Sequence, residues 1–263
     1  KNYEHGYLGD LVLSNDGKRL YVVDQIGFRM VVVNTETQRV ADNIPTGRYP
    51  FGISFSPDEQ RIYVANVGVF EYKPFTDLDP KNLKKTAHPW PATKYGSKEM
   101  EEGNAAKGIP ALVWSYSPNG TSWKVKNKTK TGFLVGQMIE DFPAVGGSSP
   151  NSVAATDKYV FVSNGNNDCV SVIDIQKDTV VYTIPLQPDP RLGKLRGLIP
   201  FGVATSPDQK RLYVAEAGIN AVAVIDIPSL KVLGHIPTGW FPSKLKVSPD
   251  GRQLIVTNAK GFG

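Results

Sequence analysis

The chain has 263 residues, of which 40% are hydrophobic, so it can bury a sizeable core in one repetitive domain or in two ordinary ones. No apolar run approaches the roughly 18 residues that a membrane-spanning helix needs. The single cysteine, Cys169, excludes an intrachain disulfide and any Cys-based metal or haem motif. The net charge of +5 permits a polyanionic partner, but it is more typical of a solvated, lysine-rich surface.

Residues 8–47 predict four consecutive strands. The stretch LGDLVLSNDGKRLYVVD alternates apolar and polar residues on both sides of Asn15-Asp16-Gly17, which is typical of a hairpin turn. A third strand is predicted over Arg29–Asn34 and a fourth over Arg39–Ile44. This segment therefore reads as one antiparallel module.

A second copy of the module begins at Tyr49 and is interrupted. Ser56-Pro57-Asp58 predicts a type I turn between its first two strands. Residues 67–109 then show no sustained period and are expected to form an irregular insertion. The pattern resumes with a third strand over Ala111–Tyr116 and a fourth over Ser122–Lys130.

The fourth strand of this second copy carries a lysine at every second position. Such a ladder is typical of the protected outer edge of a sheet. Nucleic-acid binding is the alternative, and we consider it the weaker one. The lysines are Lys124, Lys126, Lys128 and Lys130.

Three further copies follow in the same phase. The third begins at Gly147, the fourth contains GVATSPDQKRLYVAEAGINAVAVIDI from Gly202, and the fifth stops after its second strand. A residue with a side-chain hydroxyl group opens the first hairpin of every copy. These residues are Ser14, Ser56, Thr156, Ser206 and Ser248. Repetition at a fixed phase is the sequence sign of a repeat architecture.

Four antiparallel strands per module, with nothing helical between modules, predict an all-β fold of the β-propeller class. We expect residues 1–263 to form a single propeller domain with about five blade modules. The fifth module lacks two strands, and residues 1–7 are too few to supply them. The sequence therefore predicts an incomplete ring that is part of a larger propeller.

The repeated pattern LYVAxxGxxxVxVID resembles the YVTN repeat of YncE-like β-propellers. Residues 147–263, including SSPNSVAATDKYVFVSNGNNDCVSVIDI, are more specifically similar to bacterial proteins that fuse such a propeller to an alkaline-phosphatase-like phosphoesterase domain. The resemblance implies a seven-bladed, periplasmic, secreted or cell-surface protein, with a covalently linked second domain. No signal peptide opens the chain, so one is expected to have been removed or never present. No catalytic residue of the phosphoesterase domain has a counterpart here.

The repeat phase also predicts a candidate ligand site at one end of the channel. The second strands end on polar residues, and the loops between blades add cationic and aromatic ones. These residues would surround the channel mouth, although amide and carboxylate side chains in such places usually cap their own turns. The candidates are Asp24, Asn66, Asn164, Glu216, Asn258, Arg48, Arg196 and Trp240, with Phe51, Phe201 and Phe241 as aromatic walls.

No nucleophile elbow, P-loop or zinc-protease motif is present, so no catalytic residue is assigned. The leading hypothesis is a non-catalytic, extracytoplasmic binding or scaffold module that presents a face to a small ligand or a protein partner. No cofactor is expected, although a cation at the channel mouth is compatible with the polar ring. The alternatives are the propeller portion of a phosphoesterase-type hydrolase and a lactonase-like enzyme.

Overall fold

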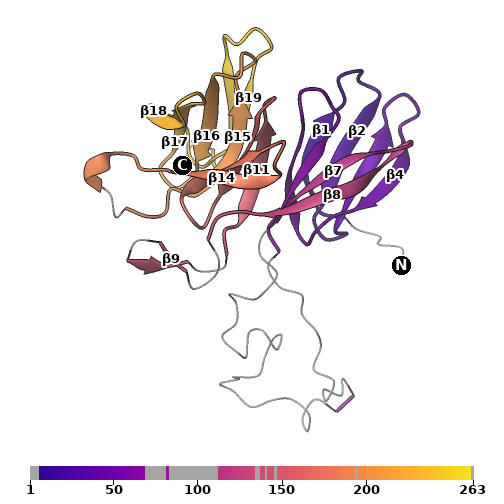
Figure 1. The fold of residues 1–263 in the computed structure, drawn as a ribbon, viewed down its shortest axis with the longest axis horizontal. Coiled ribbons are helices and arrows are strands. Elements are labelled where there is room, and N and C mark those ends of the chain that lie inside the picture. The colour runs from indigo at the N-terminus through magenta and orange to yellow at the C-terminus, as the bar shows by residue number, and fades with distance from the viewer. Residues whose placement is uncertain are drawn as a thin grey trace.

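Each complete module forms one four-stranded antiparallel sheet, and the sheets are arranged as the blades of a β-propeller (Figure 1). The computed structural model describes residues 6–68, 81–82, 112–133, 137–139, 141–144, 147–192 and 195–261. The predicted all-β fold is confirmed. Nearly all of the predicted insertion, residues 67–109, lies outside the described residues.

In every complete blade, the strands pair in the order in which they occur in the chain. Blade 1 consists of β1 (Leu8–Leu13), β2 (Arg19–Asp24), β3 (Arg29–Asn34) and β4 (Arg39–Pro45). Blade 2 consists of β5 (Pro50–Phe55), β6 (Ile62–Asn66), β7 (Leu112–Asn119) and β8 (Ser122–Lys130).

The later blades repeat this order. Blade 3 consists of β11 (Pro150–Ala155), β12 (Tyr159–Asn164), β13 (Cys169–Asp174) and β14 (Thr179–Pro185). Blade 4 consists of β15 (Pro200–Thr205), β16 (Arg211–Glu216), β17 (Ala221–Asp226) and β18 (Lys231–Pro237). Blade 5 contains β19 (Pro242–Val247) and β20 (Leu254–Asn258).

Two small elements lie outside the blades. A hairpin of β9 (Met138–Ile139) and β10 (Phe142–Pro143) precedes blade 3, and the short helix η2 (Pro190–Leu192) follows it. The sequence did not predict the hairpin, because two-residue strands show no alternation. Among the described residues, no helix has the length and apolar character needed to span a membrane.

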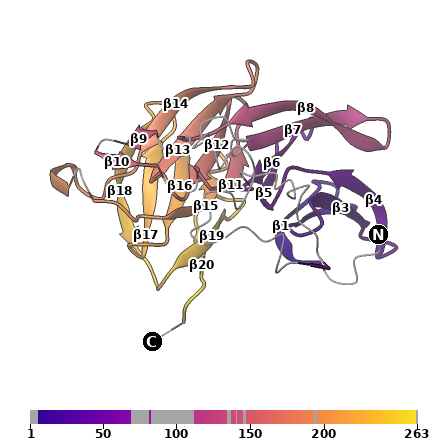
Figure 2. The same cartoon turned by 90° about the horizontal axis from the view of Figure 1, so that it is seen from below.

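The first strand of each blade lies at the centre of the molecule. Consecutive inner strands pack side by side in the order β1, β5, β11, β15 and β19. The fourth strands β4, β8, β14 and β18 lie at the periphery (Figure 2). The inner strands therefore line the central channel, as the repeat phase predicted.

Serine and aspartate side chains fix the first hairpin of four of the five blades. In blade 2, Ser56 Oγ donates to Asp58 Oδ1 and also accepts the N–H of Arg61 at 3.0 Å. The pairs Ser14–Asp16, Ser206–Asp208 and Ser248–Asp250 repeat the first of these bonds. These hydrogen bonds satisfy the turn's own polar groups, which explains why the motif recurs.

Apolar side chains fill the space between neighbouring blades. Met30 and Val32 of blade 1 meet Ile62 and Val64 of blade 2, and Tyr116 completes this cluster. Similar clusters join blades 2 and 3, blades 3 and 4, and blades 4 and 5. The blades are therefore held together by apolar side chains that are buried between neighbouring sheets.

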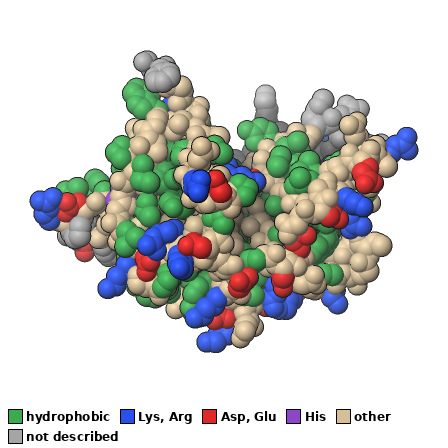
Figure 3. Space-filling model, turned by 90° about the horizontal axis from the view of Figure 1, so that it is seen from above, with side chains coloured by type: hydrophobic (Ala, Val, Ile, Leu, Met, Phe, Trp, Pro, Cys, Tyr) green, Lys and Arg blue, Asp and Glu red, His purple; other side chains and the backbone are tan. Residues whose placement is uncertain are grey.

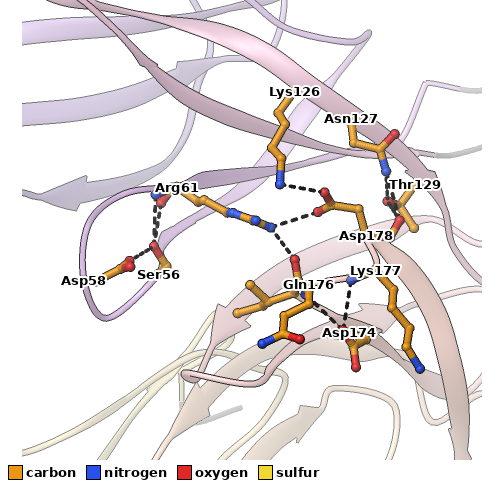
Figure 4. Close-up of polar contacts among 11 residues, drawn as sticks. Ser56, Asp58, Arg61, Lys126, Asn127, Thr129, Asp174, Gln176, Lys177 and Asp178 are labelled. Carbon is orange, nitrogen blue, oxygen red and sulfur yellow. Dashed lines mark hydrogen bonds and ion pairs between the residues drawn. The ribbon is translucent and has the colours of Figure 1, made fainter.

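A polar network also joins blades 2 and 3 (Figure 4). The Asp178 carboxylate pairs with Arg61 at 3.1 Å and with Lys126 at 3.0 Å. Its backbone carbonyl accepts hydrogen bonds from Asn127 Nδ2 and Thr129 Oγ1. A single turn residue of blade 3 is thus bound by β8 of blade 2 and by Arg61, which directly precedes β6.

The outward face of blade 1 is apolar, and among the described residues no other blade packs against it. Leu11 and Leu13 of β1 are 56% and 48% exposed. They lie opposite Val22 and Leu20 of β2, so these four aliphatic side chains share one face of the sheet. We call this set, with Val31, Val33 and Val40, the open face of blade 1. In blades 2 to 4 the corresponding face packs against another blade.

Candidate functional site

A cavity of about 320 Å³ lies where the inner strands meet. Its lining comes from β1, β5, β11, β15 and β19, together with Gln25 from the turn after β2. Seen from above, the surface is notched between the two halves of the molecule, and hydrophobic side chains lie on both flanks (Figure 3). This cavity is the candidate site on the central axis.

One acidic and one basic side chain face each other across this cavity. Lys244 Nζ on β19 forms an ion pair with Asp10 Oδ2 on β1. Asp10 Oδ2 also accepts the N–H of Ile53 at 3.3 Å, which ties the carboxylate to blade 2. The two side chains are in direct contact, so a ligand that carries both charges binds here by replacing this contact with one bond to each side chain.

The aromatic part of the lining is built by two equivalent phenylalanines. Phe51 and Phe201 each follow the first proline of an inner strand, and their rings meet edge to face with centroids 6.3 Å apart. Phe241 continues the row, with its centroid 6.2 Å from that of Phe201. Apolar walls beside a few polar groups are the usual composition of a small-molecule pocket.

Close approach of the inner strands keeps the cavity narrow. A Cβ atom on Gly52 would lie 2.6 Å from the Cα of Ser152, and one on Gly202 would lie 2.6 Å from the carbonyl oxygen of Ser243. Ser152 Oγ in turn accepts the N–H of Val203 at 3.3 Å. Glycine is therefore required at these two positions by backbone contact between blades.

Four of the predicted ring residues lie buried between blades. Asp24 accepts the N–H of Gly27 at 3.0 Å and pairs with Arg29 at 3.0 Å. Asn66 donates to the carbonyl oxygens of Val64 and Leu112, and Asn164 donates to Ser171 Oγ. Glu216 is fully buried and is described further below. Capping or bridging within the blade accounts for the first three.

The other four candidates lie nearer the surface. Asn258 is exposed at the end of β20, and Trp240 is 56% exposed in the loop before β19. The Arg48 guanidinium lies 5.6 Å from the centre of the Phe28 ring, and Arg196 donates to the carbonyl oxygen of Ile139. None of the eight candidates is among the residues that line the cavity. A role for them in binding stays a prediction.

The lining residues that the sequence did not single out come mainly from the inner strands, with Tyr7 and Gln25 just outside them. Asp10, Asn151, Ser152, Ser243 and Lys244 line the cavity. The alignment of the repeats could have identified three of them. Asp10, Ser152 and Lys244 occupy the position in the first strand that Gly52 and Gly202 hold in their own blades. Phe51 and Phe201, by contrast, were expected as aromatic walls and do line the cavity.

The aspartates that end the third strands of blades 3 and 4 bind the backbone of their own turns. Asp174 Oδ1 accepts the N–H groups of Gln176 and Lys177, and the latter bond is the main cause that lowers the pKa of Asp174. Asp226 Oδ2 accepts the N–H of Ser229 at 3.0 Å. These carboxylates are bound by their own turns, which confirms a capping role.

Within the described residues, no group of three or more His, Cys, Asp or Glu side chains is placed to hold a metal ion. The acidic side chain that lines the cavity, Asp10, is already paired with Lys244. Donors for a cation at the channel mouth are therefore few, and a cation there stays a prediction.

The lysine ladder lies on β8, the outermost strand of blade 2. Lys126 pairs with Asp178, and Lys128 Nζ lies 3.9 Å from the centre of the Trp114 ring. Two of the four lysines are thus engaged in contacts within the molecule. This placement agrees with protection of a sheet edge.

Comparison with known proteins gives the same fold. No family model matches the chain. It is 28% identical over 130 residues to the seven-bladed beta-propeller protein Rv1057 of Mycobacterium tuberculosis, and the match covers 48% of this chain and 30% of that protein.

Solved structures resemble the chain over most of its length. A functionally unknown protein from Desulfotomaculum acetoxidans superposes with a TM-score of 0.62 at 14% identity, covering 95% of this chain and 62% of the other. The Cps50 (Swd1) beta-propeller domain of Myceliophteria thermophila also gives 0.62, at 12% identity, covering 97% of this chain and 64% of the other. The chain thus spans less than two thirds of these proteins, and the likeness establishes a β-propeller.

Proposed function

We propose that this β-propeller is a non-catalytic binding module whose ligand or partner loop enters the channel cavity. The observation that carries the proposal is the cavity itself, whose lining holds the ion pair of Asp10 and Lys244 together with the rings of Phe51 and Phe201. The opposed charges favour a small zwitterion, such as a free amino acid, or a loop that presents both charges. The amino group would bind Asp10, and the carboxylate would bind Lys244.

We further propose that the chain supplies five blades of a longer, seven-bladed and extracytoplasmic protein. The open face of blade 1 supports this, because aliphatic side chains that pack between blades elsewhere are exposed there. The seven-bladed relative Rv1057 supports it too, because the match covers 30% of that protein. The resemblance to YncE-like propellers, including those fused to a phosphoesterase domain, supports a periplasmic, secreted or cell-surface location.

Ligand-observed NMR with the proteinogenic amino acids tests the binding proposal. We expect binding to the wild-type protein and a loss of at least about tenfold in affinity for Lys244→Met, because one charge of the pair is removed. Lys246→Met is the matched control, since Lys246 lies on the same strand but not in the cavity lining. Equal binding by both variants, or no binding by the wild type, would contradict the proposed site.

The same preparation tests the non-catalytic part of the proposal. We expect no hydrolysis of a phosphate monoester or of a γ-lactone above the uncatalysed rate. Turnover of either substrate would contradict the non-catalytic proposal. If a substitution in the cavity lining also reduced that turnover, the protein would be the corresponding phosphoesterase or lactonase.

A further inference from the structure

Among the described residues, the contact between blades 3 and 4 encloses an acid and a base whose facing atoms lack a hydrogen-bonding partner. Glu216, the last residue of β16, has a fully buried side chain, and its Oε2 lies 3.3 Å from Nε2 of His235 on β18. In the part of the chain that the structure describes, neither Glu216 oxygen nor His235 Nε2 has a hydrogen-bonding partner. A buried polar group of this kind is costly unless it is paired.

The sequence of blade 4 explains why these two side chains meet. Glu216 lies opposite Ala221, and His235 lies opposite Ala223, so all four share one face of the sheet. The two alanines of β17 leave room for Glu216 to reach across that strand to β18. No other polar side chain is needed between them.

Blades 1 and 3 fill the corresponding space with a polar partner. In blade 1 the equivalent of Ala221 is Arg29, which pairs with Asp24. In blade 3 the equivalent of Ala223 is Ser171, which accepts a hydrogen bond from Asn164. Blade 4 differs because its buried carboxyl group meets only an imidazole on the far strand.

Charged and titratable neighbours add little to this pair. Asp168 of blade 3 raises the pKa of Glu216, but its oxygens already accept the N–H groups of Gly197 and Ile199. Cys169 is buried beside Asp168. Arg196 lies in the loop before blade 4, near Cys169, and its Nη2 donates to a backbone carbonyl.

His235 connects the pair to solvent. Its side chain is 17% exposed and lines a groove of about 450 Å³ between the peripheral strands β14 and β18. Tyr182 and Lys231 are the other titratable residues in that lining. Protons can therefore reach the pair through His235, although Glu216 itself is closed off.

We propose that Glu216 and His235 share a single proton at neutral pH, and that its loss makes the contact between blades 3 and 4 sensitive to alkaline pH. With the proton in place, one hydrogen bond joins β16 to β18, so Glu216 Oε2 and His235 Nε2 each have a hydrogen-bonding partner. Without it, an uncompensated carboxylate remains beside the apolar cluster that joins the two blades.

The directions of the shifts agree with this arrangement. Burial raises the pKa of Glu216 to about 8, and burial lowers the pKa of His235. The folded protein then keeps one proton on Glu216 and His235 up to about pH 8. In the unfolded chain, the same two side chains lose their last proton near the ordinary histidine pKa of about 6.5. Stability should therefore fall between about pH 6.5 and 8, where only the folded state binds that proton.

Urea unfolding between pH 6 and 9 tests the proposal with Glu216→Gln. Relative to this variant, the unfolding equilibrium constant of the wild type should rise on the order of tenfold between pH 6.5 and 8. His5 and His88 titrate in both proteins and cancel in the ratio. Glu36→Gln, an exposed control, should leave the pH dependence of the wild type unchanged. A constant ratio between wild type and Glu216→Gln would overturn the proposal.

The ring nitrogen shifts of His235 provide a second readout that needs no stable variant at position 216. Comparison with a spectrum of His235→Gln assigns the signals among the three histidines. We expect the wild-type His235 signals to change around pH 8. A single transition near pH 6.5, as for an exposed histidine, would show that no proton is shared and would overturn the proposal.

Discussion

Cys169 illustrates how burial controls the chemistry of a single side chain. It begins β13, is 2% exposed, and receives a long contact from Asn164 Nδ2 at 3.6 Å. Burial raises the pKa of its thiol to about 12, so almost no thiolate exists at pH 8.

We expect iodoacetamide at pH 8 to leave Cys169 unmodified in the folded protein and to alkylate it once urea unfolds the chain. Because Cys169 is the single cysteine, the intact mass reports one event. Modification of the folded protein at the rate of a free thiol would show that blade 3 opens readily in water.

Residues with left-handed backbone end many of the turns, although they are not glycine. Gln38, Asp178 and Leu230 each precede a fourth strand with φ between 53° and 55°. Side chains other than glycine adopt this region at a cost of roughly 1 kcal/mol. The positive φ angle that these turns share therefore lowers the stability of the folded protein slightly at each position.

Gln38→Gly is expected to raise the free energy of unfolding by about 0.5–1 kcal/mol, because glycine relieves this strain at an exposed position. Urea denaturation measures the change. Thr37→Gly, one residue earlier and without a positive φ, should instead lower stability. A loss of stability in Gln38→Gly would mean that the side chain contributes a contact of its own.

Among the elements, the turn before β14 forms the clearest polar link between two blades. Asp178 is held by Arg61 and Lys126 of blade 2, and the side chains of Asp178 and Arg61 are both largely buried. Partly buried pairs of this kind contribute more than exposed ones, since solvent screens them less.

We expect Asp178→Ala to lower the free energy of unfolding by about 1–3 kcal/mol. A double-mutant cycle with Arg61→Met isolates the coupling between the two side chains. The exposed pair Asp189–Arg191 provides the control, and its cycle should give no more than about 1 kcal/mol. Equal coupling in the two cycles would show that the link between blades contributes no more than a surface ion pair.

The strands and turns were largely predictable from the sequence, and the site was not. The prediction for β3, Arg29–Asn34, matches the structure, and the Ser–Asp turns recur where expected, because period and turn chemistry are local. Whether Glu216 faces the channel or a neighbouring blade depends on packing between sheets. Lys244 and Asp10 meet only because the inner strands converge, which no local pattern reveals.

At the scale of the whole molecule, the open face of blade 1 is the largest departure from ordinary burial. Leu11, Leu13 and Val40 are each about half exposed on one sheet. Apolar side chains gathered on one face usually mark a surface that another protein segment covers.

We expect the 263-residue chain to self-associate through this face, and we expect Leu11→Lys with Leu13→Lys to suppress the association by placing two charges there. Sedimentation velocity over a range of concentrations measures the effect. Val181→Lys, an exposed apolar residue on β14, should leave the association unchanged. If only Val181→Lys dissociates the protein, the chains associate through the groove between β14 and β18 and not through the open face of blade 1.

The strictly sequential strand order has a mechanical consequence. In all four complete blades each strand pairs with the next in the chain, so every blade is a unit of local contacts joined to its neighbours by side-chain packing. A chain of this kind pulled from its two ends should lose blades one after another rather than in a single event. The two-stranded blade 5, with the fewest backbone pairs to break, should yield first, and the force trace should then show a series of larger, similar steps.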